Sequence, residues 1–110
     1  MAKRAMEQLT ESRFYVFMAF GRGAMCGTDI AAYIERRTEG RLLIGPATLY
    51  TILAKFEKEG YLTETAVEGR KRTYQITERG RRAYVAEVDR LCRCLGDAAH
   101  AEKEGEESEC

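Results

Sequence analysis

Residues 44–62, IGPATLYTILAKFEKEGYL, have the pattern of one amphipathic helix with a defined start and end. Pro46 suits the first helical turn, because a residue there needs no N–H and the fixed φ of proline is already helical. Gly60 suits the left-handed position that ends a helix. Four apolar residues between them recur at i, i+3, i+4 and i+7, the spacing of a single buried stripe. They are Leu49, Ile52, Leu53 and Phe56.

The opposite side of this helix carries small, hydroxyl-bearing and basic side chains. They are Ala47, Thr51, Ala54, Lys55 and Lys58, with Thr48 and Tyr50 on the two flanks. Such a face suits a DNA groove, where hydroxyl and ammonium groups contact phosphates and base edges. It lacks the Arg, Asn and Gln side chains that make bidentate contacts with bases. The pattern therefore indicates affinity for DNA better than it indicates sequence readout, which would then rest on DNA shape.

Two shorter helices are predicted before this stretch. The first begins at Thr10 or Ser12, either of which can cap it, and ends at Gly21. The second runs from residue 27 or 28 to residue 37, with Ile30 and Ile34 directed inward. Residues 41–44 are predicted to form a short strand, and residues 1–9 a mobile arm, because they show no periodic pattern.

After Gly60 the apolar period changes from 3.6 to about 2. Residues 62–67 and 72–76 are two runs rich in threonine and β-branched residues, joined by a polar turn that contains Gly69. Two such runs predict a β-hairpin. Its tip would carry three consecutive bases, Arg70, Lys71 and Arg72.

A last helix is predicted from Thr77, its N-cap, to residue 95. Four apolar residues follow at intervals of 4, 3 and 4, the heptad-like spacing of a helix that packs on another helix. They are Tyr84, Val88, Leu91 and Leu95, and we interpret them as dimerisation residues. Residues 96–110 are glutamate-rich without an apolar period, so we expect an acidic, disordered tail.

The order of these elements predicts the fold class. It is mainly α with a small β-hairpin, a winged helix-turn-helix plus one C-terminal dimerisation helix. The domains expected are a DNA-binding domain over residues 1–76, the dimerisation helix over residues 77–95 and the tail over residues 96–110. In this layout the third helix enters the major groove, the preceding helix fixes its angle, and the hairpin tip reaches the neighbouring backbone.

Charge is distributed unevenly along the chain, although the formal net charge is zero. Residues 96–110 hold six acids and one base, so residues 1–95 carry five net positive charges. A basic body is compatible with a polyanionic partner. No apolar run approaches the roughly 18 residues of a membrane span, and the N-terminus lacks a signal-peptide pattern. We therefore expect a cytoplasmic protein without a membrane partner.

Three groups of residues carry a resemblance to a known family. They are Gly45-Pro46 with Thr48-Leu49-Tyr50, Phe56-Glu57 and Gly60-Tyr61-Leu62; Arg70–Arg72 with Tyr74; and Thr77 with Gly80-Arg81. Together they resemble the PadR family of bacterial transcriptional regulators, over about residues 9–95. The resemblance implies a DNA-binding regulator. It also suggests that Tyr15 lies at the DNA-facing edge of the first helix, whereas periodicity alone is equally compatible with a core position.

The resemblance has limits. Ala47 and Phe56 stand where the family often has glycine and leucine, and tryptophan, which lines the drug pocket of one branch, is missing. Longer members have a further helical region for dimerisation and effectors. We therefore do not extend multidrug sensing to this chain, and a small-molecule effector remains an open, unidentified partner.

The chain has four cysteines, Cys26, Cys92, Cys94 and Cys110, which we expect to be reduced. Cys92 and Cys94 could form part of a metal or redox sensor. Residues i and i+2 of a straight helix point about 200° apart, however, so the two thiols cannot share a metal without unwinding. We interpret them as packing residues.

The function predicted is a homodimeric transcriptional regulator, a repressor, that binds a roughly palindromic operator in double-stranded DNA. The predicted DNA contacts are Tyr15, Thr48, Tyr50, Thr51, Lys55, Lys58, Arg70, Lys71 and Arg72. No nucleotide-binding loop, zinc motif or catalytic constellation is present, so neither a cofactor nor an enzymatic activity is predicted. The alternatives are a winged-helix protein-interaction module without DNA binding, and a metal- or redox-sensing regulator that uses Cys92 and Cys94.

Overall fold

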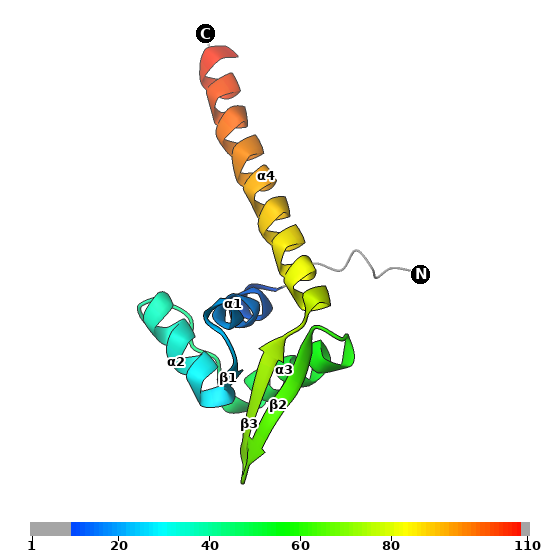
Figure 1. The fold of residues 1–110 in the computed structure, drawn as a ribbon. Helices are drawn as coiled ribbons and strands as arrows, with labels where there is room; N and C mark the ends of the chain where they lie inside the picture. The colour runs from blue at the N-terminus through cyan, green and yellow to red at the C-terminus, as the bar shows by residue number, and fades with distance from the viewer. Residues whose placement is uncertain (1–9, 109–110) are drawn as a thin grey trace.

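The computed structural model describes residues 10–108, with side chains described through Glu104. The predicted arm, residues 1–9, lies outside this part of the chain. Figure 1 shows a small body of helices and a sheet from which one long helix projects. In chain order the elements are α1 (Glu11–Ala19), the 3-10 turn η2 (Phe20–Arg22), β1 (Met25–Cys26), α2 (Gly27–Arg37), α3 (Pro46–Lys58), β2 (Leu62–Glu68), β3 (Lys71–Ile76) and α4 (Glu78–Ser108). This arrangement confirms the predicted winged-helix layout.

Local sequence signals set where the first three helices begin. Thr10 Oγ1 accepts the N–H of Arg13 at 3.3 Å and caps α1, as predicted. Asp29 Oδ2 accepts the backbone N–H of Cys26 at 3.3 Å at the start of α2. The hydrogen bond from the Cys26 thiol, followed by this backbone N–H, lowers the pKa of the Asp29 carboxyl. Pro46 is the first residue of α3, which confirms its predicted position.

The end of α3 is fastened to the start of α4. Gly60 has φ +83°, and the N–H groups of Gly60 and Tyr61 donate to the carbonyls of Glu57 and Phe56 at 3.0 and 2.8 Å. These two bonds form a Schellman motif, which confirms the predicted glycine cap. Thr77 Oγ1 then donates to the Gly60 carbonyl at 2.7 Å and accepts the N–H of Gly80 at 3.0 Å. One threonine thus caps α4 and holds it against the end of α3.

The sheet has three strands in the order β1-β3-β2, all antiparallel. Glu68 pairs with Lys71, so Gly69 and Arg70 form a two-residue turn, and Gly69 supplies the positive φ of +63° that such a turn requires. Strand β1 was not predicted, because two residues are too short to show a period. The predicted strand over residues 41–44 is wrong: the segment is a loop, and Leu42 donates its N–H to Thr38 Oγ1 at 3.1 Å.

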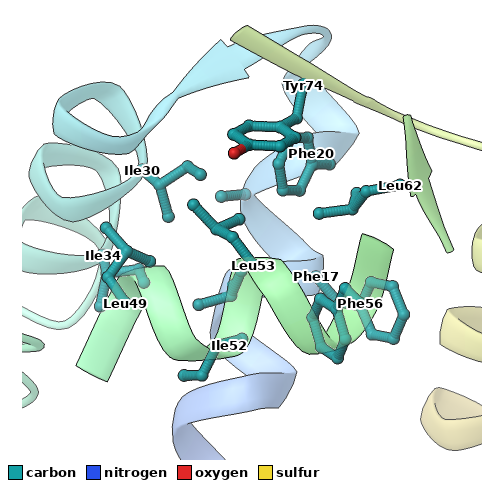
Figure 2. Packing of buried hydrophobic residues seen from close by; sticks show 12 residues of the cluster. Phe17, Phe20, Ile30, Ile34, Leu49, Ile52, Leu53, Phe56, Leu62 and Tyr74 are labelled. Atoms are coloured by element: carbon teal, nitrogen blue, oxygen red, sulfur yellow. The ribbon is translucent and has the colours of Figure 1, made fainter. Parts of the chain in front are cut away.

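One apolar core joins α1, α2, α3 and the sheet. Figure 2 shows the buried side of α3 facing Phe17, Phe20, Ile30 and Tyr74. The rings of Phe17 and Phe56 stack with centroids 4.2 Å apart. All four apolar residues of the predicted α3 stripe are buried, with exposed fractions between 1 and 5%. The core therefore fixes which face of α3 is open.

Helix α4 continues to Ser108, well beyond the predicted end at Leu95. The expectation of disorder from residue 96 onward is therefore wrong for the described residues. Alanine, glutamate and lysine are strong helix formers, and His100 and Glu104 pair at 3.1 Å across one turn. Among the described residues, no helix is long and apolar enough to cross a membrane.

Candidate nucleic-acid interface

The open face of α3 consists of the side chains that the sequence pattern placed there. Thr48, Tyr50, Thr51 and Lys58 are exposed and Lys55 is half-exposed. Lys55 Nζ lies 3.8 Å from a carboxylate oxygen of Glu59, a distance at which an exposed ion pair is weak. Lys58 has no ion-pair partner among the described residues. Both ammonium groups are therefore available to an anionic ligand.

Two hydroxyl groups on this face differ in what they can still bind. The Thr51 hydroxyl donates to the Ala47 carbonyl at 3.0 Å, so its oxygen can only accept from a ligand. Tyr50 is 55% exposed and leans toward the start of α2, where a Cβ added at Gly27 would lie 3.5 Å from the Tyr50 hydroxyl. Tyr50 thus extends the open face of α3 to the N-terminus of α2.

The hairpin of β2 and β3, the wing, carries the predicted basic tip. Arg70, Lys71 and Arg72 are exposed, but their environments differ. Arg72 Nε lies 3.3 Å from Glu64 Oε2. This carboxylate oxygen is buried and has no hydrogen bond, so the ion pair with Arg72 offsets the cost of burying its charge. The Tyr74 phenol, and then the Glu64 carboxylate, raise the pKa of Arg72. Within residues 10–104, no carboxylate pairs with Arg70 or Lys71.

The start of α2 adjoins both the open face of α3 and the wing, because Tyr50 lies against Gly27 and Cys26 pairs with Thr73 of β3. After the hydrogen bonds with Cys26, the charge of Lys71 further lowers the pKa of the Asp29 carboxyl. After Tyr74 and Glu64, the charge of Glu57 further raises the pKa of Arg72. Because Tyr50 also reaches the start of α2, the structure places the α3 face and the wing base around a common neighbour.

Tyr15 is half-buried and packs against the core. Its hydroxyl accepts a hydrogen bond from Arg41 Nη2 at 3.2 Å, and Arg41 also pairs with Glu11 at 3.1 Å. Tyr15 therefore lies beside the loop that leads into α3. Arg41 was missed by the sequence reasoning, which treated its segment as a strand. A base in the loop between α2 and α3 is the signal that could have identified it.

The predicted dimerisation residues lie along α4 with increasing exposure. Tyr84 is half-buried and stacks on Phe14 of α1, with ring centroids 5.5 Å apart. Val88 and Leu91 are half-buried, and Leu95 is 72% exposed. Tyr84 thus already packs against another side chain of the protomer, whereas most of the Leu95 side chain is exposed to solvent.

Cys92 and Cys94 are both free and exposed, so they do not pack within the protomer. They project from a continuous stretch of α4 at i and i+2. No cluster of three or more potential metal ligands occurs in the part of the chain that the structure describes. This geometry gives the metal-sensing alternative no supporting observation.

Several solved structures share this fold. A transcriptional regulator from Clostridium thermocellum aligns with a TM-score of 0.71 and 22% identity, over 84% of this chain and 96% of that one. RosR of H. salinarum aligns with a TM-score of 0.66 and 20% identity, over 89% of this chain and 99% of that one. Bacillus subtilis PadR in complex with operator DNA aligns with a TM-score of 0.63 and 19% identity, over 72% of this chain and 48% of that one. At these identities the likeness shows the fold.

The family assignment rests on sequence. No curated protein matches the chain. The model of the transcriptional regulator PadR-like family matches residues 16–86, which span the core, α3, the wing and the first turns of α4. The match covers well over half of the chain, and it places the protein among transcriptional regulators rather than enzymes. The chain therefore belongs to the PadR-like family of transcriptional regulators.

Proposed function

We propose that this protein is a homodimeric transcriptional repressor that binds a roughly palindromic operator. The observation that supports it best is the division of α3 into two faces. One face is buried in the core, and the other presents hydroxyl and ammonium groups beside a wing with two bases that lack close carboxylates. That combination suits a duplex, whose groove takes a helix and whose backbone takes the wing.

The proposed contacts divide by chemistry. Thr48, Tyr50 and Thr51 reach base edges or phosphates from α3, and Lys55 and Lys58 add charge. Arg70 and Lys71 bind the backbone from the wing, whereas Arg72 contributes less because Glu64 already offsets its charge. Tyr15 is proposed to lie at the edge of the interface, with Arg41 beside it. Sequence preference then rests largely on DNA shape, since this face of α3 offers no bidentate side chain.

The dimer is proposed to form through α4. Tyr84, Val88, Leu91 and Leu95 lie on one face of the helix, and this face is incompletely covered within the protomer. A twofold dimer would present two α3 helices about one DNA turn apart, which predicts two half-sites at that spacing. Repression would follow from occupation of the promoter, in the cytoplasm.

The DNA proposal is tested by charge removal at the wing. Replacing Arg70 and Lys71 by alanine removes four charges from a dimer. We expect duplex affinity to fall for every sequence, and the slope of log K against log salt to become shallower by about 3 to 4. Fluorescence anisotropy on a labelled duplex over a salt series measures both quantities. Removing two exposed charges from α4, with Arg82→Ala and Arg93→Ala, is the matched control and should leave the slope nearly unchanged.

Two results would count against DNA binding. If the wild-type protein binds no duplex, or binds it with no dependence on salt, the fold serves protein interaction instead. An equal effect of the wing variant and its control would show that the wing is not a specific contact.

The dimer proposal is tested separately. Leu91→Glu places a charge in the apolar α4 face, so we expect the dimer dissociation constant to rise by at least 100-fold. Sedimentation equilibrium measures it. Ala86→Glu, at an exposed position on the opposite side of α4, is the control and should remain a dimer. Persistence of the dimer in Leu91→Glu would mean that the interface lies elsewhere.

A further inference from the structure

A cluster of bases lies outside the proposed DNA interface. Arg22 of η2 and Arg36 and Arg37 of α2 line a shallow, open hollow of about 200 Å³ together with Tyr33, and we refer to this hollow as the cavity. The Arg22 guanidinium carbon lies 6.0 Å from the centre of the Tyr33 ring. We call these three arginines and the tyrosine the basic cluster.

The arginines of the basic cluster differ from five other arginines of the chain in having no carboxylate partner among the described residues. Arg41, Arg72, Arg82, Arg90 and Arg93 each pair with a carboxylate. Among the described residues, no carboxylate pairs with Arg22, Arg36 or Arg37. The C-terminus of α2 favours positive charge in its last turn but does not neutralise it. Three guanidinium groups around one cavity therefore present uncompensated charge to an anionic group.

The position of the basic cluster separates it from the DNA-facing elements. The N-terminus of α2, at Gly27, lies against Tyr50, and Arg37 lies ten residues further along the same helix. That separation is roughly 15 Å at the rise of an α-helix. In Figure 1 the wing tip points away from the side on which α4 projects, and the C-terminal end of α2 is directed toward that side. The anion for this cavity would therefore approach from the side of α4.

The chain itself carries a segment of the matching charge. Residues 96–110 hold six acids and one base, and Asp97, Glu102 and Glu104 are exposed on α4. Glu102 continues the face of Leu91 and Leu95, because positions 91, 95, 98 and 102 follow helical spacing. The proposed dimer face thus ends in a carboxylate where an apolar residue would be expected.

This acidic end cannot reach the basic cluster of its own protomer while α4 is helical. The helix runs straight away from the body in Figure 1. Residues 95 to 108 alone extend roughly 20 Å. If two copies pair antiparallel along the α4 face, the end of one α4 lies beside the start of the other, where α4 packs on α1 through Tyr84 and Phe14.

We propose that the acidic end of α4, residues 97–104, docks against the basic cluster of a second copy, so that two reciprocal ionic contacts flank the apolar centre of the dimer. The inference rests on the proposed homodimer and adds a second surface to it. Carboxylate–guanidinium pairing provides orientation as well as attraction, and partly exposed contacts of this kind weaken with salt.

Charge reversal on each side, followed by combination, tests the docking on the full-length chain. We expect Arg36→Glu with Arg37→Glu to weaken dimerisation about tenfold at low salt, because each dimer loses two exposed contacts of modest strength. Glu102→Lys should also weaken dimerisation, because Glu102 lies at the end of the dimer face. The combined variant should recover to within about threefold of wild type, because the reversed charges again attract. Lys103→Glu, which removes the single base of the segment, should tighten the dimer. Sedimentation equilibrium at low and high salt measures all four.

The outcomes separate the docking from the dimer proposal. If the combined variant shows no recovery, or if the weakening persists at high salt, the docking is overturned. If Leu91→Glu dissociates the dimer but the charge variants do not weaken it, the apolar interface holds and the docking alone fails. A monomeric wild-type protein overturns both. Loss of duplex affinity in Arg36→Glu with Arg37→Glu, at concentrations where the dimer is intact, would make the basic cluster a DNA contact and also overturn the docking.

Discussion

Helices α3 and α4 both carry an apolar stripe at helical spacing, yet the two stripes have different environments. In α3, Leu53 and Phe56 are 1 and 2% exposed. In α4, Val88 is half-buried and Leu95 is 72% exposed. When the chain covers the apolar side of a helix, the polar side is left as the surface for a partner. When the apolar side remains uncovered, that side is itself a candidate contact surface.

The difference follows from how many elements surround each helix. Helix α3 lies between α1, α2 and the sheet, and its end is held by the Schellman motif at Gly60. Only the beginning of α4 has comparable support, from the Thr77 cap and the stacking of Tyr84 on Phe14. Further along, α4 projects beyond the body (Figure 1).

The largest effect should come from truncating the covered stripe. Phe56→Ala removes a buried ring that stacks on Phe17, so we expect the free energy of unfolding to fall by about 3 to 5 kcal/mol. Leu95→Ala is the matched truncation on the uncovered stripe, and in the monomeric Leu91→Glu background it should cost less than about 0.5 kcal/mol. Urea unfolding measures both. Similar losses for the two variants would remove the distinction between the helices.

A smaller effect is expected at the junction of the two helices. A Cβ at Gly80 would collide with the Tyr61 backbone carbonyl and lie 2.9 Å from Ile76 Cγ1, so Gly80→Ala should destabilise the protein by about 2 kcal/mol. Gly96 lies in the same helix with open space around it. Gly96→Ala should therefore stabilise α4 by up to about 1 kcal/mol. Thermal unfolding distinguishes a stabilising from a destabilising substitution. If both substitutions stabilise the protein, the backbone around Gly80 is not tightly packed.

The smallest effect concerns the inward side of α4. Two hydrogen bonds from Arg90, at 3.0 and 2.6 Å, lower the pKa of the buried Glu87 carboxyl. A lowered folded pKa gives stability that is present above the usual glutamate pKa of about 4.3, and it is lost as the pH falls through the folded value. Glu87→Gln should therefore cost about 1 kcal/mol at pH 7 and nearly nothing at pH 2. An equal cost at both pH values would assign the effect to packing.

Short-range signals predicted much of the fold, and the errors have a common origin. Thr10, Pro46, Gly60 and Thr77 act within a few residues of themselves, and each ends or begins a helix as predicted. The errors concern features that depend on distant neighbours. Strand β1 exists because Met25 and Cys26 pair with β3, and residues 41–44 lack an equivalent partner among the described strands.

The candidate site shows the same division. The open face of α3 and the basic wing tip could be predicted from spacing and charge alone. The unequal roles of Arg70 and Arg72 could not, because Glu64 approaches Arg72 only across the hairpin. Arg41 beside Tyr15 and the exposure of Cys92 and Cys94 also depend on packing that spacing does not encode.

By itself the sequence determined which stretches are helical, which face of each helix is apolar, and where the charges lie, because these are properties of residues a few positions apart. The tertiary structure decided which apolar face the chain covers and which it leaves uncovered. That outcome depends on how many elements surround each helix. The apolar side of α3 is covered by neighbouring elements, whereas α4 extends beyond the elements that could cover it. The same packing gathers Arg22, Arg36 and Arg37 around one cavity, although η2 and the end of α2 are separated along the chain.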